Sequence, residues 1–536
     1  MDKCVTLDYG IIDELPAVDS EKVNGLLKEA LIKSASDGEL NFRSGAPAKT
    51  AVVAEFRQGF CRDAWAEMQL SADAAFNQCF LNDQRAGFNR KIIVLDDDPT
   101  GVQTVHDISV YTDWSKQTIE DGFAQPNDMF FILTNSRSFT TAQTEAVHLD
   151  IGKTIAEVSK KRNQPFIVIS RGDSTLRGHY PLETDSLRKG IELNCAVKYD
   201  GEIICPFFPE GGRYTIGDVH YVKDGAQLIP AGQTEFAKDK SFGYHASNLK
   251  DWCAEKTKNT FPRKDIVSIS LDSLRAMDIE GIVAQLMNVT DFGKVIVNAA
   301  SYDDVKVFIA AYLMALKQGK EFIFRSAAAL PKVLGSVSDR PLLTKGELVP
   351  SSCKTGGIII VGSHVQKTTR QLEALRNSDL DIHFIEFDQH RVLEAGGLED
   401  EAKKAIAQAD ELIAQGHSVV VHTRRDRLDL NTEDADKQLQ ISVAISDALT
   451  GIIAGLTVRP RFIIAKGGIT SSDVGTKALR VKRANVMGQI AHGIPVWLTG
   501  EESLFPGMPF IIFPGNVGND ETLKEIVEEL MGKTRD

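Results

Sequence analysis

The chain has 536 residues, a formal net charge of −13, 43% hydrophobic residues and 25% charged residues. This length exceeds one ordinary hydrophobic core and predicts two or three domains. The acidic balance argues against a nucleic acid or an anionic membrane as the main partner, because proteins meet those surfaces with basic stripes. The seven cysteines are scattered without a C-x-x-C pair, which indicates reduced thiols in a cytoplasmic protein and makes a zinc site unexpected.

The first 90 residues show helical patterns but no alternation of strands and helices. Apolar residues recur at helical spacing over 21–35 and 51–81. We therefore expect a helical N-terminal extension over 1–90, which packs either on the core or on a second subunit of a homodimer. The start, MDKCVTLDYG, has neither the basic nor the apolar stretch of a secretory signal, and no apolar run is long enough to span a bilayer.

From residue 91 the pattern changes to short apolar runs that alternate with helical segments. Near-continuous apolar strands separated by helices are typical of a parallel sheet covered on both faces. The segment 212–225 breaks this rhythm and predicts a β-hairpin that serves as a lid or a dimer arm. A first α/β domain is expected over 91–340, with strands at 92–96, 129–135, 166–170, 202–206, 265–270, 295–300 and 321–325, and helices at 141–162 and 301–319.

The stretch 341–356 is rich in Ser, Pro, Gly and charged residues and predicts a linker. A second α/β series follows over 357–536. Its expected strands are 357–363, 382–388, 418–423, 461–468, 495–500 and 510–516, with helices at 399–416 and 436–456. The expected fold class is therefore α/β, with two domains that are each built on a mostly parallel sheet flanked by helices.

Ligands of open parallel sheets bind beyond the carboxyl ends of the strands, so the residues after each strand are the candidates for chemistry. The first strand is followed by DDDPTG, in which Asp96 closes the strand and Asp97 and Asp98 precede Thr100 and Gly101. One interpretation is a solvated acidic turn with a helix-capping aspartate. In the other, one carboxylate takes a proton from a substrate or holds Mg²⁺, and another orients a hydroxyl.

The next two strand ends carry arginines. Arg137 follows one of them, and the loop SRGDSTLRGH after the other contains Arg171, Asp173, Ser174 and Arg177. Guanidinium groups suit carboxylates and phosphates, and an aspartate suits the hydroxyls of a polyol. The two arginines of the loop are also expected to offset the repulsion among the three aspartates. The alternative is a structural Arg–Asp pair that only holds the loop.

The strand ends of the second domain are rich in glycine instead. They include Ser363 after a glycine, the run Gly467, Gly468, Ile469 and Thr470, and the pair Gly515 and Asn516. Glycine permits close approach of the backbone, and the helix that follows each turn offers N–H donors to a phosphate. Three such turns in one domain indicate a nucleotide. GSHVQKTT lacks the second glycine of a Walker A loop, and no G-x-G-x-x-G is present.

These strand ends suggest a division of labour. Carboxylates, arginines and hydroxyls in the first domain suit a small polar acid, and glycine turns in the second suit phosphates. A cleft between two such domains is the expected layout of a phosphoryl transfer between two substrates.

The blocks DDDPTGVQTV, SRGDSTLRGHYPLE, KGGITSSD and PGNVGND resemble the signature blocks of the four-carbon acid sugar kinase family, formerly a family of unknown function. These kinases phosphorylate the terminal hydroxyl of threonate, erythronate or 3-oxo-tetronate with ATP. The resemblance covers about 91–536 and not 1–90. It implies an acid-sugar domain followed by a nucleotide domain, with ATP and Mg²⁺ as cofactors.

Roles follow from the strand ends together with this resemblance. Asp98 is the expected catalytic base, with Asp97 beside it at the substrate hydroxyls, and which carboxylate holds Mg²⁺ stays open. The expected substrate-binding residues are Thr100, Gly101, Arg137, Arg171, Asp173, Ser174 and Arg177. The expected ATP-binding residues are Ser363, Gly467, Gly468, Ile469, Thr470, Gly515 and Asn516. Gly172 stands where the family pattern has a serine, which bears on the identity of the acid.

Three alternatives stay open. One is a kinase of another small hydroxy acid, and a weaker one is an NAD-linked reductase. The third is a sensor that binds ATP and a sugar acid without turnover. The acidic strand ends argue against a sensor, because a protein that only binds an anion gains nothing from adjacent carboxylates.

Overall fold

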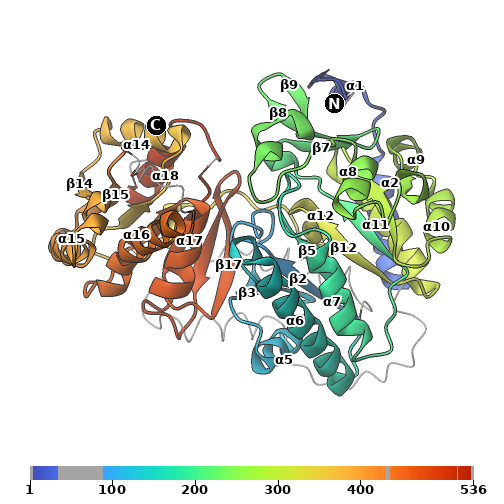
Figure 1. The fold of residues 1–536 in the computed structure, drawn as a ribbon, viewed down its shortest axis with the longest axis horizontal. Coiled ribbons are helices and arrows are strands. Elements are labelled where there is room, and N and C mark those ends of the chain that lie inside the picture. The colour runs from blue at the N-terminus through green and yellow to red at the C-terminus, as the bar shows by residue number, and fades with distance from the viewer. Residues whose placement is uncertain (1–3, 34–88, 427, 429–434, 516, 533–536) are drawn as a thin grey trace. The chain divides into compact units, whose positions relative to one another are not determined.

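The computed structural model describes residues 4–33, 89–426, 428, 435–515 and 517–532, which divide into two compact units (Figure 1). The first unit contains 4–33, 89–101 and 113–339, and the second contains 102–112 and the described residues from 340 onward. The helix expected over 51–81 lies outside the described residues. Within the described ranges, no helix combines the length and the apolar character that crossing a bilayer requires.

The first unit is built on a parallel sheet, and its strands confirm the apolar runs predicted from the sequence. The strand order is β10-β11-β6-β12-β5-β2-β4, and every neighbouring pair is parallel. Nearly all side chains of the central strands are buried, as expected for a sheet with helices on both faces. The strands are β2 (Lys91–Asp96), β4 (Met129–Leu133), β5 (Phe166–Arg171), β6 (Gly201–Cys205), β10 (Val267–Ile269), β11 (Gly293–Val297) and β12 (Phe322–Ser326).

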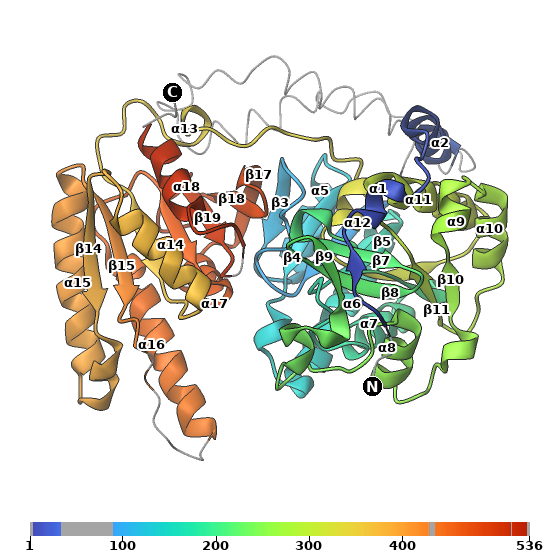
Figure 2. The ribbon, with the colours of Figure 1, turned by 90° about the horizontal axis from the view of Figure 1, so that it is seen from above.

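Helices cover both faces of this sheet (Figure 2). α6 and α7 pack along each other, and α11 packs against α2 and α10. α6 begins with a capping box between Thr140 and Gln143, which satisfies the first N–H groups of the helix. The helix expected at 21–35 is confirmed as α2, and it packs on the core of its own chain. The helices are α1 (Ile11–Glu14), α2 (Ser20–Lys33), α5 (Lys116–Ala124), α6 (Thr141–Arg162), α7 (Leu182–Glu192), α8 (Leu249–Lys256), α9 (Leu271–Arg275), α10 (Ile279–Met287), α11 (Tyr302–Lys317) and α12 (Ala329–Leu334).

The hairpin expected at 212–225 is present and belongs to a small antiparallel sheet. This sheet has the order β1-β9-β8-β7, formed by β1 (Leu7–Asp8), β7 (Arg213–Ile216), β8 (Val219–Asp224) and β9 (Gln227–Pro230). Its first strand comes from the N-terminal segment, which ties that segment to the first unit.

The second unit is built on a mixed sheet with the order β3-β17-β18-β19-β16-β13-β15-β14. The strands from β19 to β14 are parallel, whereas β3, β17, β18 and β19 pair antiparallel. β3 and β17 were not expected from the sequence. The strands are β3 (Ile108–Tyr111), β13 (Ile358–Val361), β14 (Ile382–Phe387), β15 (Ser418–Thr423), β16 (Ile463–Lys466), β17 (Arg483–Ala491), β18 (Ile494–Thr499) and β19 (Pro509–Phe513).

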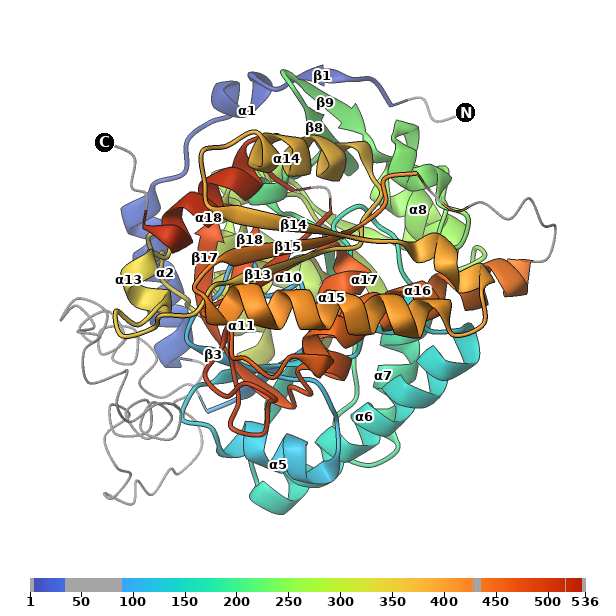
Figure 3. The ribbon, with the colours of Figure 1, turned by 90° about the vertical axis from the view of Figure 1, so that its left-hand side faces the viewer.

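Helices cover the mixed sheet on both faces as well, with α14 and α18 on one face and α15 and α16 on the other (Figure 3). The stretch 341–356, expected as a linker, contributes Leu343, Leu348 and Val349 to the hydrophobic core of this unit. The helices are α13 (Lys345–Leu348), α14 (Gln366–Arg376), α15 (Gly397–Ala414), α16 (Ala435–Gly455), α17 (Gly468–Asp473) and α18 (Thr522–Met531).

In each sheet the chain adds strands on both sides of one strand, β2 in the first unit and β13 in the second. In the first unit the chain runs from β2 to β4 on one side and then to β5 on the other side of β2. In the second unit it runs from β13 to β14 and β15 on one side and then to β16 on the other. Because ligands of open α/β sheets bind at the carboxyl ends of the strands beside such switch points, the ends of β2, β5, β13 and β16 are the expected ligand-binding positions.

Candidate functional site

The three aspartates at the end of β2 are buried rather than solvated. The side chains of Asp96 and Asp97 are 1% and 2% exposed, and that of Asp98 is 17% exposed. Asp98 accepts hydrogen bonds from the backbone N–H of Thr100, at 2.7 Å, and from its hydroxyl. A Cβ at position 101 would lie 1.9 Å from a carboxylate oxygen of Asp96, so only glycine fits there. The turn therefore holds Asp98 as the carboxylate most accessible to a ligand.

Two guanidinium groups offset the negative charge of this turn. Arg137, in the short helical turn after β4, places Nη2 2.6 Å from Asp97 Oδ1 and Nη1 2.7 Å from Asp98 Oδ2. Arg171, the last residue of β5, places Nη1 3.1 Å from Asp96, 3.4 Å from Asp97 and 3.7 Å from Asp98. Buried carboxylates need such paired and hydrogen-bonded partners.

Arg177 pairs with aspartates other than the three of this turn. Its Nε donates to Asp173 at 2.6 Å, and its guanidinium lies 3.7 Å from Asp239. Asp173 joins the aspartate turn through its backbone N–H, which donates to Asp97 at 3.2 Å. The expectation that both arginines of SRGDSTLRGH offset the aspartates is therefore wrong for Arg177, because the side chain of Asp173 lies closer to it.

The pKa values of the three aspartates differ in direction. Burial raises the pKa of Asp96 to about 8 against the attraction of Arg171, and burial also raises the pKa of Asp97. Burial acts in the same sense on Asp98, but Arg137, Arg171 and the hydrogen bonds from Thr100 outweigh it and hold its pKa below the usual value. Asp98 is thus ionised at neutral pH, whereas Asp96 keeps a proton well above the usual range.

Arg325, at the end of β12, is a site residue that sequence reasoning missed. A Cβ at position 172 would lie 2.1 Å from its Nη1, so Gly172, the departure from the family pattern, makes room for this guanidinium. Nη2 of Arg325 donates to the backbone carbonyl of Arg177 at 3.2 Å. In the sequence, Arg325 stands at the end of the apolar strand segment EFIFR, just as other polar residues stand at the ends of the other strands. This position is the signal that could have identified Arg325 as a candidate.

Three buried polar atoms near this turn have no hydrogen-bond partner in the described part of the chain: Nε of Arg171, Nε of Arg325 and Oε2 of Glu183. The side chains of Arg325 and Glu183 both approach Gly178, since a Cβ there would lie 3.8 Å from Nη2 of Arg325 and 3.8 Å from Oε2 of Glu183. Buried polar groups are usually paired, so these atoms are available to a polar ligand.

Hydrogen bonds from β8 and from Tyr244 hold the loop that carries Asp173. Nε2 of His220 donates to the backbone carbonyl of Ser174 at 2.8 Å, so in the neutral ring Nδ1 accepts from the hydroxyl of Thr215, at 3.0 Å. The hydroxyl of Tyr244 donates to the carbonyl of Thr175 at 2.7 Å. Burial of His220 lowers its pKa to about 4, so the ring is neutral at physiological pH.

In the second unit the expected ATP-binding residues at the ends of β13, β16 and β19 come together. A Cβ at Gly467 would lie 3.3 Å from Cβ of Ser363 and 3.3 Å from the hydroxyl of Thr470, and a Cβ at Gly515 would lie 3.3 Å from the hydroxyl of Ser363. Gly467 has φ +121°, a conformation that favours glycine. The three turns therefore form one backbone-lined surface beside the switch point between β13 and β16.

The remaining residues of this surface differ in exposure. Apart from the adjacent residues of its own helix, no atom of the described chain lies within 4 Å of a Cβ built on Gly468, and the side chain of Ile469 is 72% exposed. Val365, 50% exposed, lies beside Gly515. Asn516, also expected to bind ATP, lies outside the described residues.

Lys466 is a second residue to which sequence reasoning assigned no role. It ends β16 directly before Gly467 and is fully buried, and its Nζ donates to the carbonyl of Pro514 at 2.8 Å over the ring of Phe513. Burial, with Lys367 nearby, lowers its pKa to about 7. A buried lysine under a glycine turn is a cation that a phosphate would stabilise.

Comparisons with known proteins agree with this division into two sites. Residues 92–334 match the family model of a sugar-binding N-terminal domain, and residues 358–523 match that of a nucleotide-binding C-terminal domain. No curated protein matches the chain significantly.

Two solved structures share the fold. One, from Salmonella typhimurium LT2 and named provisionally as a tRNA synthase, is 16% identical with a TM-score of 0.56, over 81% of this chain and 98% of the other. Another, from Haemophilus influenzae and assigned to the family DUF1537, is 17% identical with a TM-score of 0.52, over 82% of this chain and all of the other. At this level of identity the likeness shows a shared fold. Residues 92–334 thus resemble sugar-binding N-terminal domains, and residues 358–523 resemble nucleotide-binding C-terminal domains.

Proposed function

We propose that this chain is an ATP-dependent kinase that phosphorylates the terminal hydroxyl of a four-carbon sugar acid, such as threonate, erythronate or an oxo-tetronate. The main support is the ionised, partly exposed Asp98 at the switch point of a sugar-binding domain, in a chain that also carries a nucleotide-binding domain. The four sequence blocks that resemble those of the kinase family contain residues of these two sites.

Arg177 is the proposed anchor for the carboxylate of the acid. Its side chain is 23% exposed, whereas that of Arg171 is 4% exposed and directed at the aspartates. Asp173, whose pKa is held well below its usual value by Arg137 and Arg177 against the effect of burial, is ionised and can accept hydrogen bonds from the hydroxyls. The unpaired atoms of Arg325 and Glu183 fit the same polar substrate.

Asp98 is the proposed partner of the hydroxyl that receives the phosphoryl group. Because its pKa is low, it accepts a hydrogen bond from the hydroxyl but takes the proton fully only late in the reaction. This suits phosphoryl transfer, in which the transition state is loose and positioning contributes more than early proton removal.

The nucleotide is proposed to bind on the surface formed by Ser363, Gly467, Thr470 and Gly515. Backbone N–H groups at the glycine turns suit the phosphates, Lys466 adds a positive charge, and the exposed side chain of Ile469 offers apolar area to the base.

Magnesium, carried in with ATP, supplies charge neutralisation at the phosphate oxygens. The carboxylate oxygens of Asp96, Asp97 and Asp98 lie within 4.8 Å of one another and are the ligand type that Mg²⁺ prefers. Arg137 and Arg171 between them contact all three groups. Asp98 has the most exposed side chain of the three, at 17%, and is the carboxylate that fits the ion or one of its waters.

The test is a screen of the purified chain with ATP·Mg²⁺ and a panel of four-carbon sugar acids, measured as ADP release and as phosphorylated product by mass spectrometry. We expect turnover that depends on one acid or a few stereoisomers. Binding of ATP and an acid without ADP release would instead identify a sensor. Oxidation of NADH with the same acids would identify a reductase.

A further inference from the structure

Two histidines and an aspartate meet at the amino ends of β14 and β15. Asp381 directly precedes β14, and His417 directly precedes β15. The two strands are parallel with Ile382 opposite Ser418, so Asp381 and His417 stand side by side. His383, two residues after Asp381, projects to the same face of the strand.

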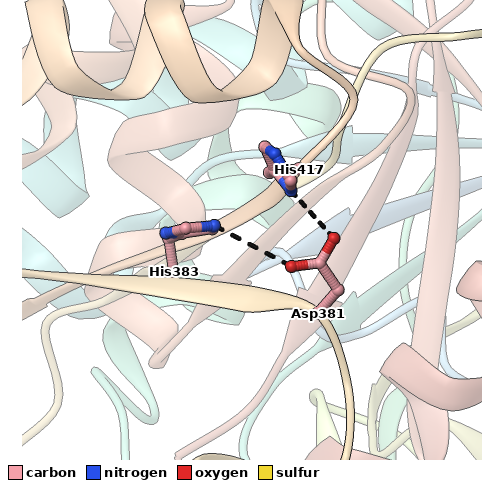
Figure 4. A group of neighbouring side chains, drawn as sticks. All are labelled: Asp381, His383 and His417. Atoms are coloured by element: carbon pink, nitrogen blue, oxygen red, sulfur yellow. Dashed lines mark hydrogen bonds and ion pairs between the residues drawn. The ribbon is translucent and has the colours of Figure 1, made fainter.

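All three side chains converge on one point (Figure 4). Oδ2 of Asp381 lies 2.8 Å from Nδ1 of His417, and Oδ1 lies 3.8 Å from Nε2 of His383. The two imidazole rings are 4.8 Å apart between centroids. One donor atom from each residue lies within 4.8 Å of the others. The three donors thus come from three side chains at the amino ends of two adjacent strands.

We propose that Asp381, His383 and His417 bind one zinc ion. Two imidazoles and one carboxylate are ligands that zinc takes at about 2.0–2.2 Å, with a water in the fourth tetrahedral position. The side chains are 65%, 45% and 34% exposed, so they can close onto an ion by small rotations at the surface. Magnesium does not fit, because it prefers oxygen ligands.

This site differs from the nucleotide surface in place and in chemistry. The glycine turns stand at the carboxyl ends of the strands, whereas Asp381 and His417 stand at the amino ends. A strand of six residues such as β15 extends over about 20 Å, so the two sites lie at opposite ends of the sheet. The expectation of no zinc considered cysteines only, and this site uses none.

The proposed ion stabilises the edge of the sheet. Among the described strands of this sheet, β14 is the last one and pairs only with β15. An edge strand with free backbone groups opens and pairs with other chains more readily than a central strand does. Zinc joins Asp381 and His383, at the start of β14, to His417, which leads into β15, and so holds this edge closed.

The experiment titrates the full chain, free of any affinity tag and of metal, with Zn²⁺ in a calorimeter and with Co²⁺ in a spectrophotometer. We expect one Zn²⁺ per chain, and a Co²⁺ spectrum of a four-coordinate site without a thiolate charge-transfer band. His383→Ala and His417→Ala should each weaken Zn²⁺ binding at this site at least tenfold. Millimolar Mg²⁺ should not compete.

The matched control is His245→Ala. His245 is an exposed histidine that also pairs with one carboxylate, Glu255, at 3.0 Å, but among the described residues it belongs to no group of three metal-ligating side chains. This variant should bind Zn²⁺ as the wild type does. The proposal is overturned if the wild type binds no stoichiometric Zn²⁺, if a thiolate band appears with unchanged binding in His383→Ala, or if all three variants lose binding equally. Circular dichroism of each variant separates lost ligands from lost folding.

Discussion

Arg137 holds Asp97 through two nitrogens: Nη2 lies 2.6 Å from Oδ1, and Nε lies 3.1 Å from Oδ2. This bidentate pair links the end of β2 to the turn after β4, and it is what allows a carboxylate that is 2% exposed to stay in the interior. The charges of the aspartate turn are therefore part of the stability of the first unit as well as of its site.

Arg137→Met should lower the free energy of unfolding of the first unit by about 3 kcal/mol, because it leaves Asp97 buried with only Arg171 nearby. The measurement is a urea titration at pH 7. Adding Asp97→Asn to this variant should recover part of the loss, since the unpaired charge is then absent. Lys116→Met, which removes an exposed ion pair with Glu157, is the control and should change stability very little.

Asp98→Asn should lower kcat of the proposed kinase by roughly 10²–10⁴, the usual effect of removing an acid–base group. The KM values should change much less, because the amide still fills the turn. Asp96→Asn is the matched comparison. Since the pKa of Asp96 is already raised to about 8, an amide resembles its protonated form and should cost far less activity. A folded Asp98→Asn enzyme with full turnover would remove Asp98 from the chemistry.

Arg177→Ala should raise KM for the sugar acid by about 10–100-fold, the range expected for one lost charge-assisted hydrogen bond. The KM for ATP should stay as in the wild type. Steady-state kinetics with each substrate varied in turn separates these effects. A change confined to the KM for ATP would place the acid elsewhere in the chain.

Much of this architecture follows from local patterns in the sequence. Apolar runs such as KIIVLD and FIVIS are short and rich in β-branched residues, which favours buried strands over helices. The polar residues that follow them meet because parallel strands end at the same edge. The convergence of Asp98, Arg137 and Arg171 was therefore predictable.

Other features depend on long-range pairing. β3 (Ile108–Tyr111) lies in the first half of the chain but pairs with β17, and no local signal shows this. β17 itself contains Gly488 and two register shifts against β18, so it lacks the clean alternation that marks a strand. The guanidinium of Arg325, more than 150 residues away in sequence, occupies the space beside Gly172. Only the folded chain shows why glycine is needed at position 172.

The lowered pKa of Lys466 predicts how nucleotide affinity changes with pH. Its pKa is lowered to about 7 by burial and by Lys367, so it loses its positive charge as the pH rises through 7. The Kd for ATP should therefore rise about tenfold between pH 7 and 8.5. Lys466→Met should bind ATP weakly at every pH in this range. Adenosine, which has no phosphate, is the control ligand and should show no such dependence. Equal pH profiles for the wild type and Lys466→Met would rule out a contact with phosphate.

The lowered pKa of His220 predicts how the stability of the loop that carries Asp173 changes in acid. Its pKa is about 4 in the folded chain and about 6.5 when unfolded. The unfolded chain therefore binds the extra proton first, and stability is lost as the pH falls from about 6.5 toward 4. The loss at pH 5 relative to pH 7 should be about 2 kcal/mol.

Native-state hydrogen exchange of the β8 amides at pH 7 and pH 5 measures this loss as a fall in the free energy of opening. His220→Gln should be less stable at pH 7, because it disturbs the bonds to Ser174 and Thr215, but it should lose about 2 kcal/mol less than the wild type on acidification. An equal loss in both proteins would mean that groups other than His220 destabilise this part of the site in acid.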